Sequence, residues 1–589
     1  MSPSEQYSDR LAQREESLAR LDRLDARAGA ARLVLAAAFL TVAWGWTEHR
    51  VSPAWLLVPA SLFIAVVLYH QRIRSLQSLA RRAVAFYRAG LERIHGQRPD
   101  GGTSGDQFVD EHHLYGADLD LFGRQSLYER MCTARTPMGA GTLARWLLTP
   151  AAPATIRERQ TCVSELRHRI DLREDLAILG EPQRIALHAD TLEKWAAAPS
   201  ELSRGWLRIA AIALVAAAAA TAGIWAIWGL AFPFLAVLVV EASLTYAFRT
   251  HVHAAVSGVE HAYDDLELFA ALLRRIEAES FDAPPLRALK KELSSHSLTA
   301  SATLSKLATL VNFVEARRNP FLTPLMLPLM YTIHSALAAE RWRQRHGQVV
   351  QSWLRVLGTI EALQSIAAYS FERPADPFPE FLEGAAAFIA TGLGHPLISF
   401  QACVRNDVDI SGETRILMVS GSNMSGKSTL LRSVGINTVL AMAGAPVCAV
   451  RLRLTPVQVG ASIRVNDSLY EGSSRFYAEI TRLRRLFEPA KLPLLFLLDE
   501  LLQGTNSTDR RIGAQGVIRA LLERGAIGLI STHDLALTDG IELQPGALKN
   551  VHFQDELLDG KLKFDFRLRD GVVTKSNGIE LMRAIGLDV

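Results

Sequence analysis

The sequence lacks several features that would indicate a function directly. Its formal net charge is only +3, too small an excess to indicate nucleic-acid binding by itself. No apolar segment occurs in residues 1–32, so we do not expect a signal peptide, and no internal repeat of fixed period is visible. The 589 residues include only four cysteines, none of them spaced as a zinc or redox motif, and we expect free thiols in a reducing compartment: Cys132, Cys162, Cys403 and Cys448.

Long uncharged apolar stretches are abundant instead. The first pair, at about 33–69, consists of Leu33–Thr47 and Val51–Tyr69, and the second lies at about 208–248, where Ile209–Val240 holds no charge. A membrane-spanning helix needs about 20 apolar residues, so we predict two transmembrane hairpins, in which Leu33–Thr47 is the shortest of four spans. The alternative is a set of buried core helices.

Arginines flank both hairpins, whereas the short loops inside the hairpins carry almost no Lys or Arg. By the positive-inside rule, both hairpins point away from the cytoplasm. We therefore expect a multi-pass protein of the inner, or cytoplasmic, membrane, with about four transmembrane helices and its large parts in the cytoplasm. The flanking residues are Arg20, Arg23, Arg27, Arg32, Arg72, Arg74, Arg81, Arg82, Arg204, Arg208 and Arg249.

The segment His70–Arg98 is rich in arginine and adjoins the first hairpin. One interpretation is that it binds anionic lipid or nucleic acid. We favour the other interpretation, in which it is the positive flank of a membrane span.

The remaining chain changes character near Gly394. Before it, Phe108–Ser200 and His251–Gly392 have helical periodicity, and we interpret the proline-containing apolar segment Asn319–Ser335 as a kinked, buried segment rather than a fifth span. After it, short apolar runs alternate with turns, which is typical of a buried parallel sheet. The predicted parts are 1–107, with the first hairpin and a basic helix, a helical region at 108–393 interrupted by the second hairpin, and a nucleotide-binding domain at 394–589.

A phosphate-binding loop follows the apolar run "RILMVS". The residues from Gly421 to Ser428 fit G-x-x-x-x-G-K-[ST], whose glycines let backbone N–H groups approach phosphate oxygens. Lys427 would reach the β- and γ-phosphates, and Ser428 would offer its hydroxyl to Mg²⁺. We expect ATP to contact Gly421, Ser422, Asn423, Met424, Ser425, Gly426, Lys427, Ser428 and Thr429.

Two further apolar strands end in residues suited to phosphate chemistry. "LLFLLDE" ends in Asp499, which is suited to hold Mg²⁺, and Glu500, which is placed to orient or deprotonate an attacking water. His533 follows the strand in "LISTHD" and is placed to contact the γ-phosphate. We predict Glu500, His533 and Lys427 as the catalytic residues, with Ser428 and Asp499 as the metal ligands.

The stretch between these motifs, Asn466–Leu486, puts Ser473 and Ser474 in front of a helical pattern. A serine at a helix N-terminus presents a hydroxyl, a backbone N–H and the helix dipole to an anion, although it can equally be an ordinary helix cap.

With these motifs the chain resembles the MutS family, whose ATPase is related to ABC ATPases. "GSNMSGKST" is similar to G-P-N-M-G-G-K-S-T, with Ser422 and Ser425 in place of Pro and Gly. "GSSRFYAEI" is similar to G-R-S-T-F-M-x-E-M, with Ser474 at the signature serine. "LLDELLQGTNSTD", "STHDLALT", "NVHF" and "TKSNGIELMRAIGL" resemble later motifs, and Asp118–Leu166, which includes "TPMG" at Thr136–Gly139, resembles the start of the family's helical core.

The resemblance implies a fold class and an assembly. The fold is an α/β P-loop (ABC-type) ATPase domain at the C-terminus, preceded by an all-α, MutS-like core and lever region that here carries two transmembrane hairpins. The family's assembly implies a homodimer with two composite ATP and Mg²⁺ sites, in which Ser474 reaches the γ-phosphate of the nucleotide held by the other subunit. ATP binding would close the dimer and hydrolysis would reopen it.

Other regions depart from the family. Residues 1–107 leave no room for the family's mismatch-reading domain, and we expect the C-terminal helix-turn-helix extension to be missing or minimal. The family's adenine-stacking aromatic falls near Cys403, with Phe400 as the nearest aromatic. These differences argue against mismatch recognition, while a clamp built from the middle helices keeps DNA, branched or duplex, among the candidate partners.

The leading hypothesis is a membrane-anchored, MutS-like ATP hydrolase whose ATP-gated dimer acts on DNA or on a partner near the membrane. The alternatives are an ABC-type ATPase in membrane transport and a nucleotide-switched membrane scaffold. Against transport, "GSSRF" is not the L-S-G-G-Q of transporters, and the hairpins carry almost no polar lining.

Overall fold

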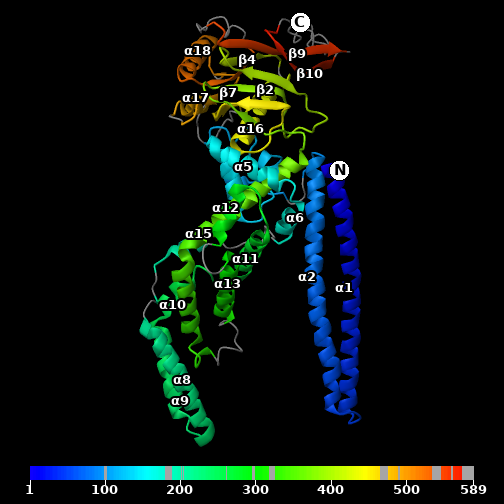
Figure 1. Ribbon diagram of the computed structural model, residues 1–589, viewed down its shortest axis with the longest axis vertical. Helices are drawn as coiled ribbons and strands as arrows, with labels where there is room; N and C mark the ends of the chain where they lie inside the picture. Colours follow the sequence, from blue (N-terminus) through cyan, green and yellow to red (C-terminus); the bar gives the residue numbers. More distant parts are fainter. Residues whose placement is uncertain are drawn as a thin grey trace. The chain divides into compact units, whose positions relative to one another are not determined.

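The structure is a computed structural model of the chain (Figure 1). Its packing forms two compact units, each assembled from separate segments: Met1–Cys132, Leu143–His168 and Leu363–Val589 in the first, and Thr133–Thr142 and Arg169–Ala362 in the second. The predicted division of the chain into three consecutive parts, with boundaries at 107 and 393, is of a different kind and stays a prediction. The residues that the structure describes are 1–98, 102–179, 189–199, 202, 205–260, 262–294, 299–316, 326–422, 424–463, 475–488, 491–503, 505–533, 545–558 and 561–573.

The first unit begins with a long helical hairpin. Helix α1 (Pro3–Thr47) starts with a capping box, because the Ser2 hydroxyl accepts the Glu5 N–H at 3.2 Å and the Glu5 carboxylate accepts the Ser2 N–H at 2.8 Å. A 3₁₀ turn, η1 (Pro53–Leu56), leads into α2 (Leu57–Ile94). The apolar stretch predicted at about 33–69 therefore forms the turn end of the hairpin, and the charged residues form its stem.

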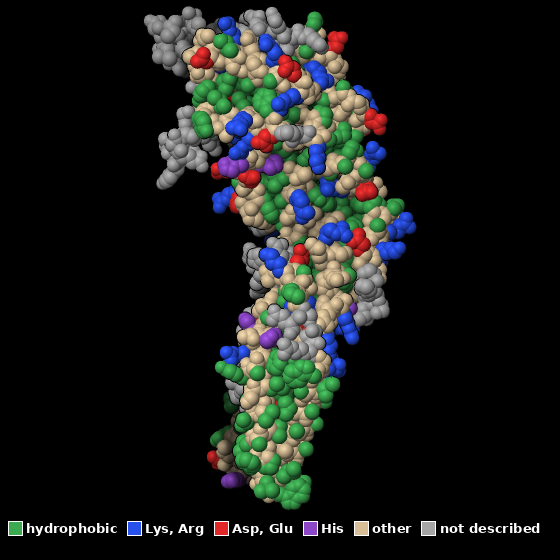
Figure 2. Space-filling model, turned by 90° about the vertical axis from the view of Figure 1, so that its left-hand side faces the viewer, with side chains coloured by type: hydrophobic (Ala, Val, Ile, Leu, Met, Phe, Trp, Pro, Cys, Tyr) green, Lys and Arg blue, Asp and Glu red, His purple; other side chains and the backbone are tan. Residues whose placement is uncertain are grey.

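Three described helical segments are long and apolar enough to cross a membrane: α1, η1 with α2, and α8 (Gly205–Trp228). A fourth is obtained if the bent pair α9 (Phe232–Ala247) and α10 (Arg249–Val256) counts as one span. Little of their apolar surface is buried, which disfavours the alternative of buried core helices. Figure 2 shows apolar side chains gathered over the α8–α9 hairpin, where Ile209, Ile227 and Phe232 are exposed. The membrane location itself stays a prediction.

The stem of the first hairpin is fixed to the last turns of α15 (Tyr331–Glu372). Arg93 of α2 forms a buried ion pair with Glu372 at 2.6 Å, and Tyr7 of α1 donates its hydroxyl to the same carboxylate at 3.5 Å. The Tyr7 ring lies against Phe371, with ring centroids 5.2 Å apart. At Gly90, a Cβ atom would come within 2.5 Å of the Tyr7 ring, so only glycine allows this approach. The hairpin and the end of α15 therefore form one packed junction.

The same junction reaches the nucleotide-binding part of the chain. Arg130 donates to the Arg93 carbonyl oxygen at 3.2 Å and to the carbonyl oxygens of Pro396 and Leu397 at 3.3 Å each. The loop that contains Pro396 connects β2 (Phe388–Leu393) with β3 (Asn406–Ile410) of the C-terminal domain. A polar chain thus connects the hairpin stem with this loop.

The C-terminal domain contains two sheets (Figure 1). The larger, six-stranded sheet has the order β10-β9-β4-β8-β7-β6, in which neighbours are parallel except for the antiparallel pair β10–β9. The sheet is therefore mixed, and the prediction of a buried parallel sheet is confirmed for its β4, β6, β7, β8 and β9 strands. The bounds are β4 Ile416–Ser420, β6 Gln458–Ser462, β7 Leu494–Asp499, β8 Ile527–Thr532, β9 Leu548–Leu558 and β10 Lys561–Asp570.

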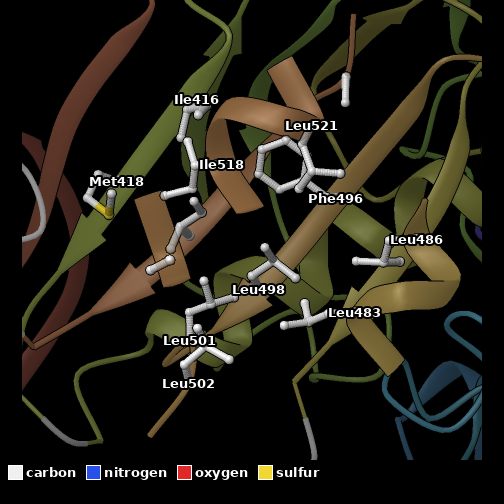
Figure 3. Close-up of a cluster of buried hydrophobic side chains, with 13 residues drawn as sticks. Ile416, Met418, Leu483, Leu486, Phe496, Leu498, Leu501, Leu502, Ile518 and Leu521 are labelled. Carbon is white, nitrogen blue, oxygen red and sulfur yellow. The ribbon is translucent and has the colours of Figure 1, made fainter. Parts of the chain in front are cut away.

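The smaller sheet has the order β1-β5-β2-β3, with β1 (Glu380–Phe381) parallel to β5 (Arg451–Leu454), and β2 (Phe388–Leu393) antiparallel to both β5 and β3 (Asn406–Ile410). Helices α16 (Lys427–Ala443), α17 (Arg475–Leu486) and α18 (Ser507–Glu523) complete the domain. Figure 3 shows one cluster of buried hydrophobic side chains between β4, β7, α17 and α18. Its members include Ile416, Met418, Leu483, Leu486, Phe496, Leu498, Leu501, Leu502, Ile518 and Leu521.

Helices account for most of the described middle region, as its periodicity predicts. The segment Asn319–Ser335 is described only from residue 326, and α15 begins within it at Tyr331. The remaining elements are η2 Asp106–Phe108, α3 Leu127–Met131, α4 Pro137–Leu148, α5 Pro153–Leu166, α6 Ile170–Leu179, α7 Ala189–Ala197, α11 Tyr263–Ala278, α12 Pro284–Leu293 and α13 Ala300–Ala316.

The Thr136–Gly139 motif lies at the start of α4, against a buried carboxylate of α15. Glu361 accepts the backbone N–H groups of Arg135 at 2.9 Å and of Thr136 at 3.2 Å, which satisfies donors at the helix N-terminus. Burial raises the pKa of Glu361 to about 7, although these hydrogen bonds act to lower it. A Cβ atom at Gly139 would lie 2.5 Å from the carboxylate, so the motif needs its glycine for this contact.

The buried pair at the hairpin junction leads to a stability prediction. Arg93→Met leaves the Glu372 charge buried without its partner, and we expect a loss of about 3–5 kcal/mol in the local free energy of unfolding. Hydrogen exchange of the α2 stem and of the end of α15 would measure it.

Two variants serve as controls. The double variant Arg93→Met with Glu372→Met removes both charges, so we expect most of the stability to return. Arg88→Ala removes an exposed pair with Glu15 and should cost about 0–1 kcal/mol. Equal losses for Arg93→Met and Arg88→Ala would contradict the role assigned to the buried pair.

Candidate functional site

The phosphate-binding loop leaves the sheet at the carboxyl end of β4. Ser420, the last residue of β4, is paired with Thr532 of β8 on one side and with His552 of β9 on the other. Gly421 and Gly426 have positive φ angles of 148° and 109°, and a Cβ atom at Gly421 would lie 2.8 Å from the Ser425 hydroxyl. The loop thus has the strand–loop–helix setting that the sequence predicts. It lies at the carboxyl ends of parallel strands, where ligands bind in α/β sheets.

Lys427 opens α16 and turns its side chain back over the loop. Its ammonium group donates to the carbonyl oxygens of Gly421 and Ser422, both at 2.8 Å. Burial lowers the pKa of Lys427, while the carboxylates of Glu500 and Asp499 act in the opposite direction. Lys427 therefore lies close enough to Glu500 and Asp499 to interact with both charges.

Two buried hydroxyl groups of the loop lack a hydrogen-bond partner among the described residues. The side-chain oxygens of Ser422 and Ser425 are buried and have no hydrogen-bond partner within the described part of the chain. Buried hydroxyls normally find a partner, so these two groups are suited to a bound phosphate. Of the other predicted loop residues, Met424 is exposed with a φ of 70°, and Asn423 lies outside the described residues.

The carboxyl ends of β7 and β8 bring the acidic pair beside this loop. Asp499 pairs with Ser531 along the ladder, and the Ser531 hydroxyl donates to its carboxylate. Both oxygens of Glu500 are also occupied, one by the ring nitrogen Nε2 of His533 and the other by the amide of Gln503. The structure therefore brings together Lys427, Asp499, Glu500 and His533.

Backbone strain accompanies the acidic pair. Glu500 and Leu502 adopt left-handed φ angles of 52° and 56°, which cost a non-glycine residue of order 1 kcal/mol or more. The Glu500 N–H is held by the backbone oxygen of Ser531 at 3.2 Å, and the Leu502 N–H is held by the buried Glu479 carboxylate at 2.5 Å. These contacts offset the strain and hold the backbone from which the Glu500 side chain projects.

The residues predicted to hold Mg²⁺ fit that ion by donor type. Ser428 and Asp499 supply a hydroxyl and a carboxylate, and Mg²⁺ is usually bound by one or two such protein oxygens together with waters and phosphates. Within the described residues, no cluster of three or more His, Cys, Asp or Glu side chains could hold a metal ion.

Helix α17 is tied into the site through residues that the sequence does not single out as functional. Glu479 of this helix bonds to Leu502, as described above, and Arg482 pairs with the fully buried Asp118. Asp118 also accepts the Ile463 N–H at 2.9 Å, so it connects α17 with the end of β6. Ser474 itself, like Gly504 and the stretch at 574–587, lies outside the described residues.

A cavity of about 240 Å³ lies beside the loop and is suited to the nucleotide base. Phe566 and Phe553 line it, together with Gly426 and Thr429 of the loop, whereas Phe400 is 75% exposed and does not line it. The lining residues are Leu393, His395, Ile398, Ala402, Cys403, Val404, Asn406, Gly426, Thr429, Leu430, Ser433, Phe553 and Phe566.

Phe566 was missed by the sequence reasoning because it comes from β10, far along the chain. Its backbone oxygen accepts the Asn406 amide at 3.0 Å, and the Asn406 side-chain oxygen accepts the Leu568 N–H at 2.8 Å. A residue of β3 thus holds β10 at the mouth of the cavity. Burial also lowers the pKa of His395, another lining residue, to about 4, so its ring is neutral at physiological pH.

Comparison with known proteins places the site in one family model, that of MutS domain V, which matches residues 417–588. A DNA mismatch repair protein MutS 2 of Halobacterium salinarum is 33% identical over 257 residues, 43% of this chain and 28% of that protein. A DNA mismatch repair protein MutS of Brevibacillus brevis is 33% identical over 263 residues (44% and 30%), and an Endonuclease MutS2 of Thermus thermophilus is 33% identical over 254 residues (42% and 32%). The chain thus spans less than a third of the length of these relatives.

The Glu500 geometry leads to the first site prediction. Glu500→Gln keeps the shape of the side chain but removes the charge that would orient or deprotonate water, so we expect ATP turnover to fall by about 10²–10⁴-fold while nucleotide binding is retained. Phosphate release and binding of a fluorescent ATP analogue would measure the two quantities. Glu523→Gln, an exposed change at the end of α18, is the control. Full turnover by Glu500→Gln would contradict the assigned role.

The cavity beside the phosphate-binding loop leads to the second site prediction. Phe566→Ala removes a ring on which the base would stack, which is worth about 1–3 kcal/mol, so we expect ATP to bind roughly 5- to 150-fold more weakly. Phe400→Ala is the matched control, because Phe400 lies outside the cavity lining and its loss should leave ATP affinity unchanged. A larger effect at Phe400 would show that the base lies elsewhere.

Proposed function

Starting from a C-terminal region that belongs to the MutS family, we propose that this protein is a membrane-anchored ATPase in which ATP binding and hydrolysis switch the conformation of the attached helices. The observation that carries the proposal is the gathering of Lys427, Asp499, Glu500 and His533 at the carboxyl edge of one sheet. These residue types in that arrangement are suited to phosphoryl transfer to water.

The roles of the residues follow from their contacts. Lys427 leaves the loop carbonyls to hold the β- and γ-phosphates, where Ser422 and Ser425 can add their unpartnered hydroxyls. Glu500 is oriented through both carboxylate oxygens, so it can direct a water at the γ-phosphate, with His533 beside it. Ser428 and Asp499 would hold Mg²⁺, which when bound neutralises phosphate charge.

We propose a homodimer in which Ser474 completes the site of the other subunit. The internal contacts of α17 support a coupled response, because this helix is bonded both to the loop after β7, through Glu479, and to Asp118, through Arg482. A pull on the start of α17 by a nucleotide in the other subunit would therefore act on the backbone that positions Glu500. Such an order of events makes hydrolysis depend on dimer closure.

The membrane part of the proposal rests on the α1–α2 hairpin and its junction. The stem is fixed to the end of α15 through Arg93, Glu372 and Tyr7, and to the loop at Pro396 through Arg130. We propose that the hairpin tips, together with α8 and α9, span the cytoplasmic membrane, and that the nucleotide domain lies in the cytoplasm. Closure of the nucleotide sites would then act on helices anchored in lipid.

DNA is the proposed macromolecular partner. The names of the relatives refer to DNA mismatch repair and to an endonuclease, and the matched region is the ATPase part of the chain. Residues 1–98 form the α1–α2 hairpin, so this part of the chain offers no duplex-reading domain, and we do not extend the proposal to mismatch reading. A clamp of middle helices that closes on ATP binding is the form in which we propose DNA contact.

Transport is the second candidate function, and one observation favours it. Glu241 lies in the apolar helix α9, is fully buried, and has no hydrogen-bond partner for either carboxylate oxygen among the described residues. An acidic side chain inside a membrane segment is costly and often marks an ion or proton pathway. The prediction that the hairpins carry almost no polar lining therefore has an exception at this position.

Binding of DNA by the detergent-purified protein tests the proposal. Plain, mismatched and branched duplexes are titrated between 50 and 200 mM salt, with and without ATP. If Lys and Arg side chains neutralise phosphates, we expect the affinity to fall by about tenfold or more over this range, and ATP to alter it.

Lys427→Ala is the control, since it should bind DNA but lose the response to ATP. Binding that is absent, or that does not change with salt, would rule out the DNA clamp and leave transport or a membrane scaffold.

A further inference from the structure

Two cysteines that are distant in the sequence lie together beside the nucleotide site. A Cβ atom placed on Gly394 would be 2.8 Å from Sγ of Cys403 and 3.2 Å from Sγ of Cys448, so both sulfurs crowd the same face of one glycine. The two side chains are hydrogen-bonded to each other. All four cysteines are free thiols, as expected, and the fold also brings Cys403 and Cys448 together, which their spacing in the sequence does not indicate.

The backbone holds the pair in place. Gly394 donates its N–H to the Cys448 carbonyl oxygen at 2.8 Å, and His395 donates its N–H to Sγ of Cys403 at 3.3 Å. The fully buried Asn437 of α16 completes the arrangement, because it accepts the Cys448 N–H at 2.7 Å and donates to the Gly394 oxygen at 2.9 Å. These contacts hold both sulfurs at one face of Gly394, and a disulfide bond would require them to close to about 2.05 Å.

The two thiols differ in chemical character. The hydrogen bond from Cys448 lowers the pKa of Cys403 to about 6, with burial opposing and Arg405 and Arg373 assisting. The same hydrogen bond, together with burial, raises the pKa of Cys448. Cys403 is therefore the thiolate and Cys448 the thiol, which is the division of roles that disulfide formation requires.

The position of Cys403 connects this pair with the nucleotide. Cys403 is partly exposed and lines the cavity that also contains Phe566 and Thr429, whereas Cys448 is buried behind it. An oxidant can reach Cys403 through the cavity when no nucleotide fills it. A covalent bond to Cys448 would draw the cavity wall toward Gly394 and change the space left for the base.

We propose that Cys403 and Cys448 form a reversible thiol–disulfide pair that responds to hydroperoxides and lowers the affinity of the cavity for nucleotide. This inference rests on the proposed function, because it assigns a regulation to the same nucleotide site. In a reducing compartment, such a pair acts as a redox sensor rather than as a structural disulfide.

The reaction proceeds in two steps. With hydrogen peroxide, the Cys403 thiolate attacks one oxygen, the O–O bond breaks, and Cys403 becomes a sulfenic acid while hydroxide leaves and takes up a proton to give water; from an organic hydroperoxide, the alkoxide leaves and becomes an alcohol. The Cys448 sulfur, losing its proton, then displaces the hydroxyl group from the sulfenic sulfur, so the S–S bond forms and a second water leaves. Two electrons pass from the thiols to the peroxide, and a dithiol reductant reverses the change.

Oxidation of the full-length protein in detergent tests the pair. Hydrogen peroxide is added, remaining thiols are alkylated, and peptides are analysed by mass spectrometry without reduction. We expect a linked peptide containing Cys403 and Cys448, removed by dithiothreitol and formed more slowly when ATP is bound. Cys403→Ser and Cys448→Ser should each abolish it, whereas the control Cys132→Ser should leave it intact.

The effect on nucleotide is measured on the same samples. We expect the oxidised protein to bind a fluorescent ATP analogue at least about tenfold more weakly, which is about 1.4 kcal/mol, with recovery after dithiothreitol. Overoxidation of Cys403 without the linked peptide, or an unchanged affinity once the disulfide has formed, would overturn the proposal. Failure of the reduced protein to bind nucleotide would refute the proposed function instead, and the peptide analysis would still report on the pair.

Discussion

The register between β4, β7 and β8 is the constraint on which the rest of the site depends. It sets Ser420 beside Thr532 and Asp499 beside Ser531, so the phosphate loop, the acidic pair and His533 leave the sheet at one edge. A shift by one residue would turn each of these side chains to the opposite face of the sheet. The buried cluster between β4, β7, α17 and α18 stabilises this register, since it packs side chains of both strands against both helices (Figure 3).

Polar contacts connect the carboxyl ends of these strands with other parts of the first unit. Glu479 and Arg482 connect α17 with the strained loop after β7 and with Asp118. On another side, the base cavity is lined by residues of the loop near His395, and the carbonyl oxygens of that loop bind Arg130, which also binds the stem of the α1–α2 hairpin. A change in the nucleotide pocket therefore has a continuous path to the hairpin stem.

Gly394 lies on this path of contacts. Gly394 lies between the cavity loop and α16, packs against two sulfurs, and is bonded to Asn437 and Cys448. The same few residues thus shape the base cavity, hold the cysteine pair and begin the loop that leads to Arg130. A covalent change at the sulfurs would act where the nucleotide pocket and the hairpin junction meet.

Features whose chemistry is local can be recognised in the amino-acid sequence. The phosphate loop needs glycines and a lysine in consecutive positions, the acidic pair follows its strand directly, and apolar stretches of membrane length are visible as composition. These features carried the resemblance to the MutS family and the predicted nucleotide site.

Contacts between distant segments depend on the three-dimensional fold. Spacing along the chain carries no signal that Phe566 rather than Phe400 lines the base cavity, that Arg93 meets Glu372, or that Cys403 meets Cys448. Each of these pairings arises because strand order and helix packing bring far positions to one place, and that order follows from burial of the whole apolar surface rather than from any short motif.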